Sequence, residues 1–148
     1  MKVKRIPPAR TALDLFAGAG GLSCGLSMAG FNVVGAVEVD DWASETYRFN
    51  HPNSPLSSAD ICELSDNFFR QYCGVDLIAG GPPCQGFSIA ASNRRKENDP
   101  RNSLYLHFIR AIEQVKPRVV LIENVKGITA ARNCDGKKIL DDIVERIS

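Results

Sequence analysis

A cysteine held behind two prolines is the residue of this chain best suited to covalent chemistry. In the stretch GGPPCQGFS (80–88), Pro82 and Pro83 directly precede Cys84. Consecutive prolines fix two backbone dihedrals and remove two N–H donors, so the peptide that enters Cys84 is extended and stiff. A buried structural cysteine needs no such aiming, whereas a misplacement of about 1 Å can slow an enzyme nucleophile roughly 100-fold. We therefore interpret Cys84 as a candidate nucleophile.

A carboxyl group ends a later apolar run and is a candidate partner for this thiol. In IENV (122–125), Glu123 and Asn124 directly follow VVLI. At the rim of a hydrophobic sheet we expect the Glu123 carboxyl group to be partly desolvated, which favours its protonated form near neutral pH. Glu123 is therefore a candidate general acid, and the alternative is an acid that caps the next turn. A thiol and a carboxylic acid on neighbouring strand ends suit addition to an electron-poor ring followed by group transfer.

A glycine-rich turn marks a candidate cofactor site. The stretch DLFAGAGG (14–21) joins the first predicted strand to the first predicted helix, where glycines let the backbone approach a ligand beside a helix N-terminus. Glu38 lies about 20 residues further on, at the end of the second predicted strand, where a carboxylate can accept hydrogen bonds from a ribose. A purely geometric turn and a solvated strand end are the alternatives. Together the two features indicate an adenosine-containing cofactor, and NAD and S-adenosylmethionine both fit.

A further acid, Asp60, lies in the segment SADI (58–61) after the second predicted helix. Its carboxylate has the chemistry to accept from an adenine amino group while Ile61 packs on the ring. An Asp before a helix is more often an N-cap, so the residue types alone favour the N-cap role.

Strands and helices must alternate along the chain to position these groups. Apolar runs predict strands at 11–16, 31–39, 74–81 and 118–125. Periodic or capped stretches predict helices at 21–30, 40–50, 64–72, 103–115 and 136–148. This order predicts an α/β fold with a doubly wound parallel sheet, which collects ligands at the carboxyl ends of its strands. The polar segment 89–102 is predicted to be an exposed, mobile loop.

The totals bound the class of protein. The formal net charge of +1 creates no global basic field, so any nucleic-acid binding must come from local charge. No run approaches 18 apolar residues and no signal peptide is apparent, so we expect a cytoplasmic protein without a membrane contact. Five cysteines without a CxxC pair, and two histidines, argue against a disulfide framework and a metal site. We expect three or four of these cysteines to be buried as small hydrophobes.

The motifs DLFAGAGG, PPCQGFS and IENV, in this order and spacing, resemble those of the cytosine-5 DNA methyltransferases over about residues 12–127. The resemblance implies a Rossmann-like methyltransferase fold that binds S-adenosylmethionine. It implies that Cys84 adds to carbon 6 of a flipped-out cytosine while Glu123 holds a proton at ring nitrogen 3. It also reverses the N-cap preference for Asp60. The cofactor-binding residues that it implies are Phe16, Ala17, Gly18, Gly20, Glu38, Val39, Asp60, Ile61 and Pro82.

Double-stranded DNA is the partner that the resemblance implies, and segment 89–102 corresponds to the family's mobile catalytic loop. The residues expected to contact the DNA or the flipped base are Pro83, Gln85, Ser88, Asn124, Val125, Arg94, Arg95, Lys96 and Arg101. For the basic residues, contact with phosphates is the functional interpretation and a solvated charge run is the alternative.

The resemblance stops after the IENV motif. No Gln-x-Arg-x-Arg segment, target-recognition region or returning helix follows it. We therefore expect residues 1–148 to be the N-terminal part of a catalytic domain, incomplete at its C-terminal side and inactive or nearly so alone. A C-terminal half or second subunit would complete it, and an exposed apolar face on the last helix would be consistent with this.

Three other functions stay open at this point. A cytosine-5 tRNA methyltransferase would use the same cysteine and glutamate. A non-catalytic fragment that binds S-adenosylmethionine or regulates a partner would not need them. A nicotinamide-dependent oxidoreductase would explain the glycine turn and Glu38 but gives no role to PPCQ or IENV.

Overall fold

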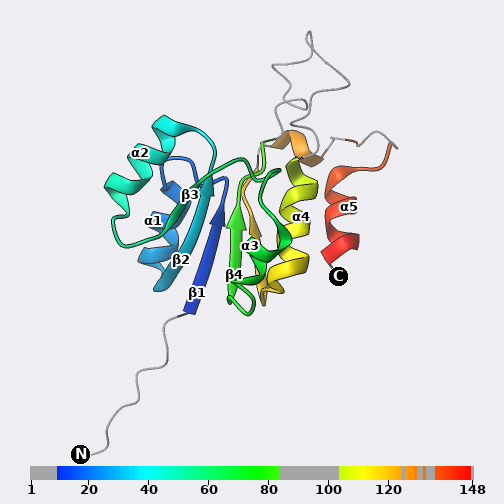
Figure 1. The fold of residues 1–148 in the computed structure, drawn as a ribbon. Helices are drawn as coiled ribbons and strands as arrows, with labels where there is room; N and C mark the ends of the chain where they lie inside the picture. Colours follow the sequence, from blue (N-terminus) through cyan, green and yellow to red (C-terminus); the bar gives the residue numbers. More distant parts are fainter. Residues whose placement is uncertain (1–9, 84–103, 125, 130–131, 133–135, 148) are drawn as a thin grey trace, which may run out of the picture.

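A five-stranded parallel sheet forms the centre of the molecule (Figure 1). The computed structural model describes residues 10–83, 104–124, 126–129, 132 and 136–147. The strands follow the order β3-β2-β1-β4-β5 across the sheet. Their bounds are β1 Arg10–Leu15, β2 Phe31–Glu38, β3 Leu56–Ser58, β4 Leu77–Gly80 and β5 Val119–Ile122.

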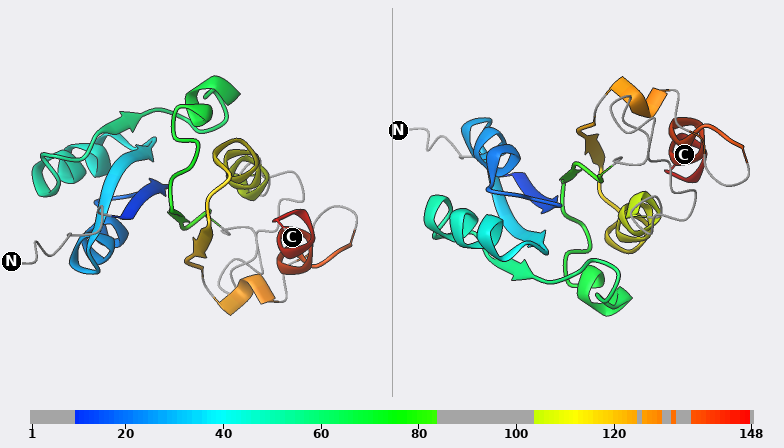
Figure 2. Two further views of the ribbon diagram at one scale, coloured as in Figure 1. Left: turned by 90° about the horizontal axis from the view of Figure 1, so that it is seen from below. Right: turned by 90° about the horizontal axis from the view of Figure 1, so that it is seen from above.

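Helices cover both faces of this sheet, as the doubly wound prediction requires (Figure 2). Helices α1 and α2 lie on one face, α3 and α4 lie on the other, and α5 packs beside α4. The bounds are α1 Gly21–Met28, α2 Asp41–Asn50, α3 Asp66–Arg70, α4 Leu104–Val115 and α5 Ile139–Ile147, with a short 3-10 helix η4 at Lys126–Thr129. The α/β fold class predicted from the sequence is confirmed.

The side chains of β1 alternate between two apolar layers. Leu13 and Leu15 join the core under α3 and α4, which includes Phe108. Ala12 packs on the opposite face with Leu26 of α1. Because a strand turns successive side chains to opposite faces, this alternation holds the end of β1 between the two helix layers.

Two predictions about individual segments were wrong. Strand β3 was not foreseen, because its three residues are only partly buried and carry little apolar pattern, so the third predicted strand is β4. The cysteines are not buried small hydrophobes in the described chain: Cys24, Cys62 and Cys73 are exposed. No helix in the described ranges is long and apolar enough to cross a membrane.

Candidate functional site

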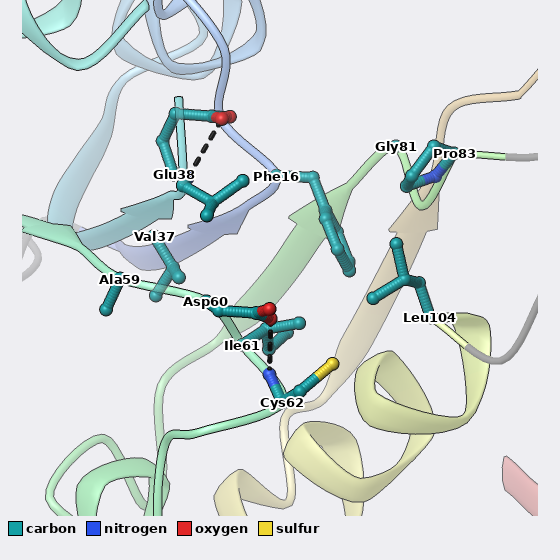
Figure 3. Close-up of a pocket in the computed structure, with 11 residues that line it drawn as sticks. Phe16, Val37, Glu38, Ala59, Asp60, Ile61, Cys62, Gly81, Pro83 and Leu104 are labelled. Atoms are coloured by element: carbon teal, nitrogen blue, oxygen red, sulfur yellow. Dashed lines mark hydrogen bonds between the residues drawn. The ribbon is translucent and has the colours of Figure 1, made fainter. Parts of the chain in front are cut away.

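A pocket of about 470 Å³ opens at the carboxyl ends of β1, β2, β3 and β4 (Figure 3). Its size is within the range of small-molecule sites. The residues that line it are Phe16, Val37, Glu38, Val39, Ala59, Asp60, Ile61, Cys62, Gly81, Pro83 and Leu104. Five predicted cofactor residues are among them: Phe16, Glu38, Val39, Asp60 and Ile61. The other four, Ala17, Gly18, Gly20 and Pro82, do not line the pocket.

The turn after β1 has a backbone that most residues avoid. Phe16, Gly18 and Gly20 all have positive φ angles, of 60°, 55° and 92°. For Phe16 this left-handed conformation costs about 1–2 kcal/mol, so the surroundings must hold it. The Ala17 amide donates to the Val37 carbonyl oxygen at 3.0 Å, which ties the turn to β2.

Glu38 joins the two strand ends that border the pocket. Its Oε2 accepts from the Gly18 amide at 2.8 Å, and its Oε1 accepts from the amides of Val39 (2.9 Å) and Asp40 (2.8 Å). A carboxylate offers about four acceptor positions, so three backbone bonds leave capacity for one further donor. Glu38 therefore fixes the glycine turn and still presents acceptor oxygen to the pocket.

Asp60 does not cap a helix, because α3 begins only at Asp66, with Ser65 as its N-cap. Asp60 Oδ1 accepts from the Cys62 amide at 2.8 Å. Hydrogen bonds from the backbone and the thiol of Cys62 hold the pKa of Asp60 below its usual value. Burial, and then the Asp60 carboxylate, raise the pKa of the Cys62 thiol, so this thiol stays protonated. The pocket thus has an anionic edge at Asp60.

Apolar side chains form the rest of the pocket wall. Ile61 and Val37 are buried, and the ring of Phe16 lies 6.4 Å from that of Phe108. Figure 3 shows the side chain of Phe16, which follows β1, and that of Leu104, the first residue of α4, both lining the pocket. Among the described residues that line the pocket, two carry carboxylates and none carries a basic side chain. Such a lining suits a neutral or cationic ligand better than a phosphate-bearing one.

The segments that follow β4 and β5 are hydrogen-bonded to each other. The Glu123 amide donates to the Gly80 carbonyl oxygen at 3.0 Å, and Asn124 Nδ2 donates to the Pro82 carbonyl oxygen at 3.1 Å. A Cβ atom added to Gly81 would lie 2.8 Å from Glu123 Oε2, so the glycine makes room for this carboxylate. The described residues that follow the two strands, Gly81 and Pro82 after β4 and Glu123 and Asn124 after β5, therefore lie side by side.

The expected desolvation of Glu123 is not found, because the residue is exposed in the described chain. Its position at the strand end leaves the carboxyl group open to solvent. The remaining predicted residues lie outside the described ranges, and their roles stay predictions: Cys84, Gln85, Ser88, Arg94, Arg95, Lys96, Arg101 and Val125.

Sequence reasoning missed a buried polar cluster beneath the glycine turn. Ser23 Oγ donates to Asp14 Oδ2 at 2.6 Å and lies 2.9 Å from the Tyr47 hydroxyl. Burial raises the pKa of Asp14 to about 6, partly opposed by the bonds from Ser23. The available signal was an acid within the apolar run TALDLF. Reasoning also missed Val37, Ala59, Cys62, Gly81 and Leu104 in the pocket lining.

Comparison with known families and sequences gives a consistent result. A model of the family described as C-5 cytosine-specific DNA methylase matches residues 10–148. The Type II methyltransferase M.DdeI of Desulfomicrobium norvegicum is 44% identical over 137 residues, covering 92% of this chain and 32% of that protein. The Type II methyltransferase M.XorII of Xanthomonas oryzae pv. oryzae is 36% identical over 138 residues, covering 90% of this chain and 31% of that protein.

Solved structures agree with the sequence matches. An E. coli prophage-encoded protein described as a DNA modification methyltransferase superposes with a TM-score of 0.75 and 37% identity, covering 94% of this chain and 38% of that chain. A mutant of Spodoptera frugiperda DNMT2 superposes with a TM-score of 0.70 and 28% identity, covering 94% of this chain and 40% of that chain. The chain spans about a third of the length of the curated relatives that it matches.

Proposed function

Because the chain belongs to the C-5 cytosine-specific DNA methylase family, we propose that it supplies the cofactor pocket and the nucleophile of a DNA (cytosine-5) methyltransferase. The observation that carries the proposal is the pocket itself. It has two carboxylates and no basic lining residue among the described ones, and it lies next to the strand end that leads into Cys84.

The residues present fit S-adenosylmethionine better than the alternative nicotinamide dinucleotide. A dinucleotide carries a pyrophosphate, which two carboxylates without a basic neighbour would repel, whereas a sulfonium cation is attracted to them. Asp60 would accept from the adenine amino group, Ile61 and Phe16 would pack on the ring with Val39 beside it, and Glu38 would hold the ribose hydroxyls. The backbone around the remainder of the cofactor would be shaped by the turn residues Ala17, Gly18 and Gly20 and by Pro82.

When bound, the cofactor supplies a methyl group on a sulfonium ion. Carbon 5 of cytosine is a poor nucleophile, so the Cys84 thiolate would first add to carbon 6 while Glu123 holds a proton at nitrogen 3. The resulting enamine would make carbon 5 able to take the methyl group, whose bond to the sulfonium sulfur breaks and leaves a neutral thioether. A base would then take the carbon 5 proton, and expulsion of the Cys84 thiolate would restore the ring. The base must leave the duplex stack to reach Cys84, at a cost of a few kcal/mol.

We also propose that DNA recognition needs further polypeptide, equivalent to the part of the relatives' sequences that lies outside the match. The relatives named Type II methyltransferases are about three times as long as the matched segment. On the described part of this chain, α5 exposes the apolar side chains of Leu140, Val144 and Ile147, which agrees with the expected apolar face. Segment 89–102 would contribute phosphate contacts through Arg94, Arg95, Lys96 and Arg101.

Calorimetric titration of the chain with S-adenosylmethionine and with NAD tests the cofactor part of this proposal. We expect binding of S-adenosylmethionine, none of NAD, and a loss of affinity in Asp60→Ala. Asp41→Ala, an exposed acid on α2, is the matched control and should bind as the wild type does. Binding of NAD in place of S-adenosylmethionine would overturn the proposal.

A further inference from the structure

One face of α2 reaches the glycine turn from the side opposite the pocket. Tyr47, Asn50 and His51 follow the spacing i, i+3, i+4, which places their side chains on one face of a helix end. His51 is the C-cap residue of α2. All three contact the turn or the first turn of α1, although the turn lies about 30 residues earlier in the chain.

Asn50 and His51 hold the carbonyl groups of the turn. Asn50 Nδ2 donates to the Ala19 carbonyl oxygen at 3.3 Å, and His51 Nε2 lies 2.9 Å from the Gly20 carbonyl oxygen. Because a carbonyl oxygen only accepts, Nε2 of His51 must carry the hydrogen in this contact. The Gly20 oxygen also accepts the first helical bond, from the Cys24 amide at 2.9 Å. Both acceptor positions of Gly20 are thereby used.

The shape of the turn also matches the His51 ring. A Cβ atom on Gly20 would overlap the imidazole of His51 and would lie 3.0 Å from Cδ2 of Tyr47. The rings of Tyr47 and His51 lie 4.7 Å apart, and Tyr47 is fully buried. The hydroxyl of Tyr47 contacts Ser23 in the first turn of α1. The helix end therefore packs against the turn as well as bonding to it.

The planar trans peptide between Gly20 and Gly21 transmits the His51 hydrogen bond to the other side of the turn. In such a peptide the N–H of the following residue points opposite to the carbonyl group. Holding the Gly20 carbonyl toward α2 therefore fixes the Gly21 N–H in the opposite direction. On the β2 side, Glu38 holds the amide of Gly18 at 2.8 Å. The turn is thus restrained from both sides.

We propose that Asn50 and His51 are positioning residues of the cofactor site, which set the orientation of the glycine turn without contacting the ligand. The inference rests on the proposed function, since it names S-adenosylmethionine as the ligand whose affinity depends on the hydrogen bonds from Asn50 and His51 to the turn. His51 acts through its hydrogen bond to Gly20 and its fit against the missing Cβ. Asn50 adds a second bond at Ala19.

The first test compares cofactor affinity in four variants by calorimetry. His51→Ala should weaken binding of S-adenosylmethionine about tenfold and Asn50→Ala about threefold, the range expected for one lost hydrogen bond. His51→Gln can still donate from a similar position and should stay within about twofold of the wild type. Thr46→Ala is the control, because Thr46 is exposed on α2 and its hydroxyl donates to the Trp42 carbonyl oxygen of the same helix.

A second measurement does not depend on the ligand. Hydrogen exchange of residues 17–22 in the free chain should become faster in His51→Ala, with the strands unchanged, and should be restored in His51→Gln. Gly20→Ala should lower the melting temperature more in the wild type than in the His51→Ala background, because the smaller side chain removes the overlap.

The two readouts separate this inference from the proposed function. Unchanged affinity and unchanged exchange in His51→Ala, or a His51→Gln variant as weak as His51→Ala, would overturn the positioning role while the function stands. If the wild-type chain does not bind S-adenosylmethionine, the proposed function fails, and hydrogen exchange alone decides whether Asn50 and His51 hold the turn.

Discussion

Asp14 is a fully buried carboxyl group beneath the glycine turn, and it shows how single residues set the behaviour of the site. Its Oδ2 accepts from Ser23, and its Oδ1 has no hydrogen-bond partner among the described residues. Burial raises the pKa of Asp14 to about 6. In the unfolded chain the same carboxyl group ionises near its ordinary value, about 4. Ionisation is therefore harder in the folded state.

This difference predicts a stability that falls as the pH rises from about 4 to about 6. In that interval the folded chain holds a proton that the unfolded chain has lost, and the total effect is at most about 3 kcal/mol. Asp14→Asn should remove this contribution. The unfolding free energy of the variant should therefore rise relative to that of the wild type as the pH increases from about 4 to about 6. Urea unfolding at pH 4, 5, 6 and 7 measures it. Glu63→Gln, an exposed acid, is the control, and parallel curves for the Asp14 variant and the wild type would contradict the prediction.

Glu38 provides a second prediction at this scale. Its two oxygens accept three backbone N–H groups, but a glutamine has only one oxygen, so its amide N–H₂ would face a donor. Glu38→Gln should therefore lower the unfolding free energy by about 1–3 kcal/mol and weaken binding of S-adenosylmethionine. Chemical denaturation and calorimetry measure the two effects. Glu45→Gln on the exposed side of α2 is the control, and equal values for both variants would refute this role of Glu38.

Phe16 and Val39, two pocket residues at the ends of β1 and β2, were predicted from the family resemblance of the motifs. Glu38 was predicted from its spacing, because it ends an apolar run about 20 residues after the glycine turn. Cys62 and Leu104 were missed, since only the packing of distant segments brings them to the same pocket. The contact of His51 with Gly20, 31 residues apart, was missed for the same reason.

Among the helices, α5 packs on α4 through a buried apolar cluster that includes Ile109 and Ile143, and one buried acid adds a polar contact. Asp142 accepts from the Tyr105 hydroxyl at 3.2 Å, from Lys137 at 3.1 Å and from Arg146 at 3.2 Å. Burial acts to raise the pKa of Asp142, but the bonds from Lys137 and Arg146 outweigh it and hold the pKa below its usual value. The stability that Asp142 contributes is therefore present at neutral pH and lost as the pH falls through the lowered pKa, the opposite of Asp14.

Replacing this acid should loosen α5 on α4 and leave the sheet intact. Asp142→Ala is expected to lower the unfolding free energy by about 1–3 kcal/mol, since it removes the acceptor that Asp142 offers to the Tyr105 hydroxyl, Lys137 and Arg146. Hydrogen exchange should become faster in residues 139–147 and stay slow in β1 and β4. Asp141→Ala, the exposed neighbour on the same helix, is the control. Uniformly faster exchange throughout the sheet would contradict a local role for Asp142.

The order of elements followed from the sequence more completely than their lengths did. The helix predicted at 40–50 is α2, with Asp40 as its N-cap, whose side chain accepts from the Ala43 amide at 2.8 Å. Strand β5 is shorter than the predicted run 118–125, because pairing with β4 ends at Ile122. Strand β3 could not be predicted from its own residues, because it is defined by pairing with β2 over three positions.

In the whole molecule, the described fold places the pocket and the ends of β4 and β5, which lead to the proposed catalytic residues, at one edge of the sheet. The curated relatives devote about two thirds of their length to sequence outside this match. The net charge of +1 gives the chain little general attraction for DNA. Methyl transfer is therefore expected only when polypeptide equivalent to the relatives' remaining length presents DNA to Cys84.

Trapping of the covalent intermediate tests whether Cys84 is the nucleophile. The chain is mixed with a complementing polypeptide, S-adenosylmethionine and duplex DNA in which 5-fluorocytosine replaces the target cytosine. Fluorine at carbon 5 cannot leave as a proton, so the thiolate should stay bound to carbon 6. We expect a denaturation-resistant protein–DNA adduct for the wild type and for Cys73→Ser, and none for Cys84→Ser. An adduct that persists in Cys84→Ser, or none in a wild-type complex that binds both DNA and S-adenosylmethionine, would contradict it.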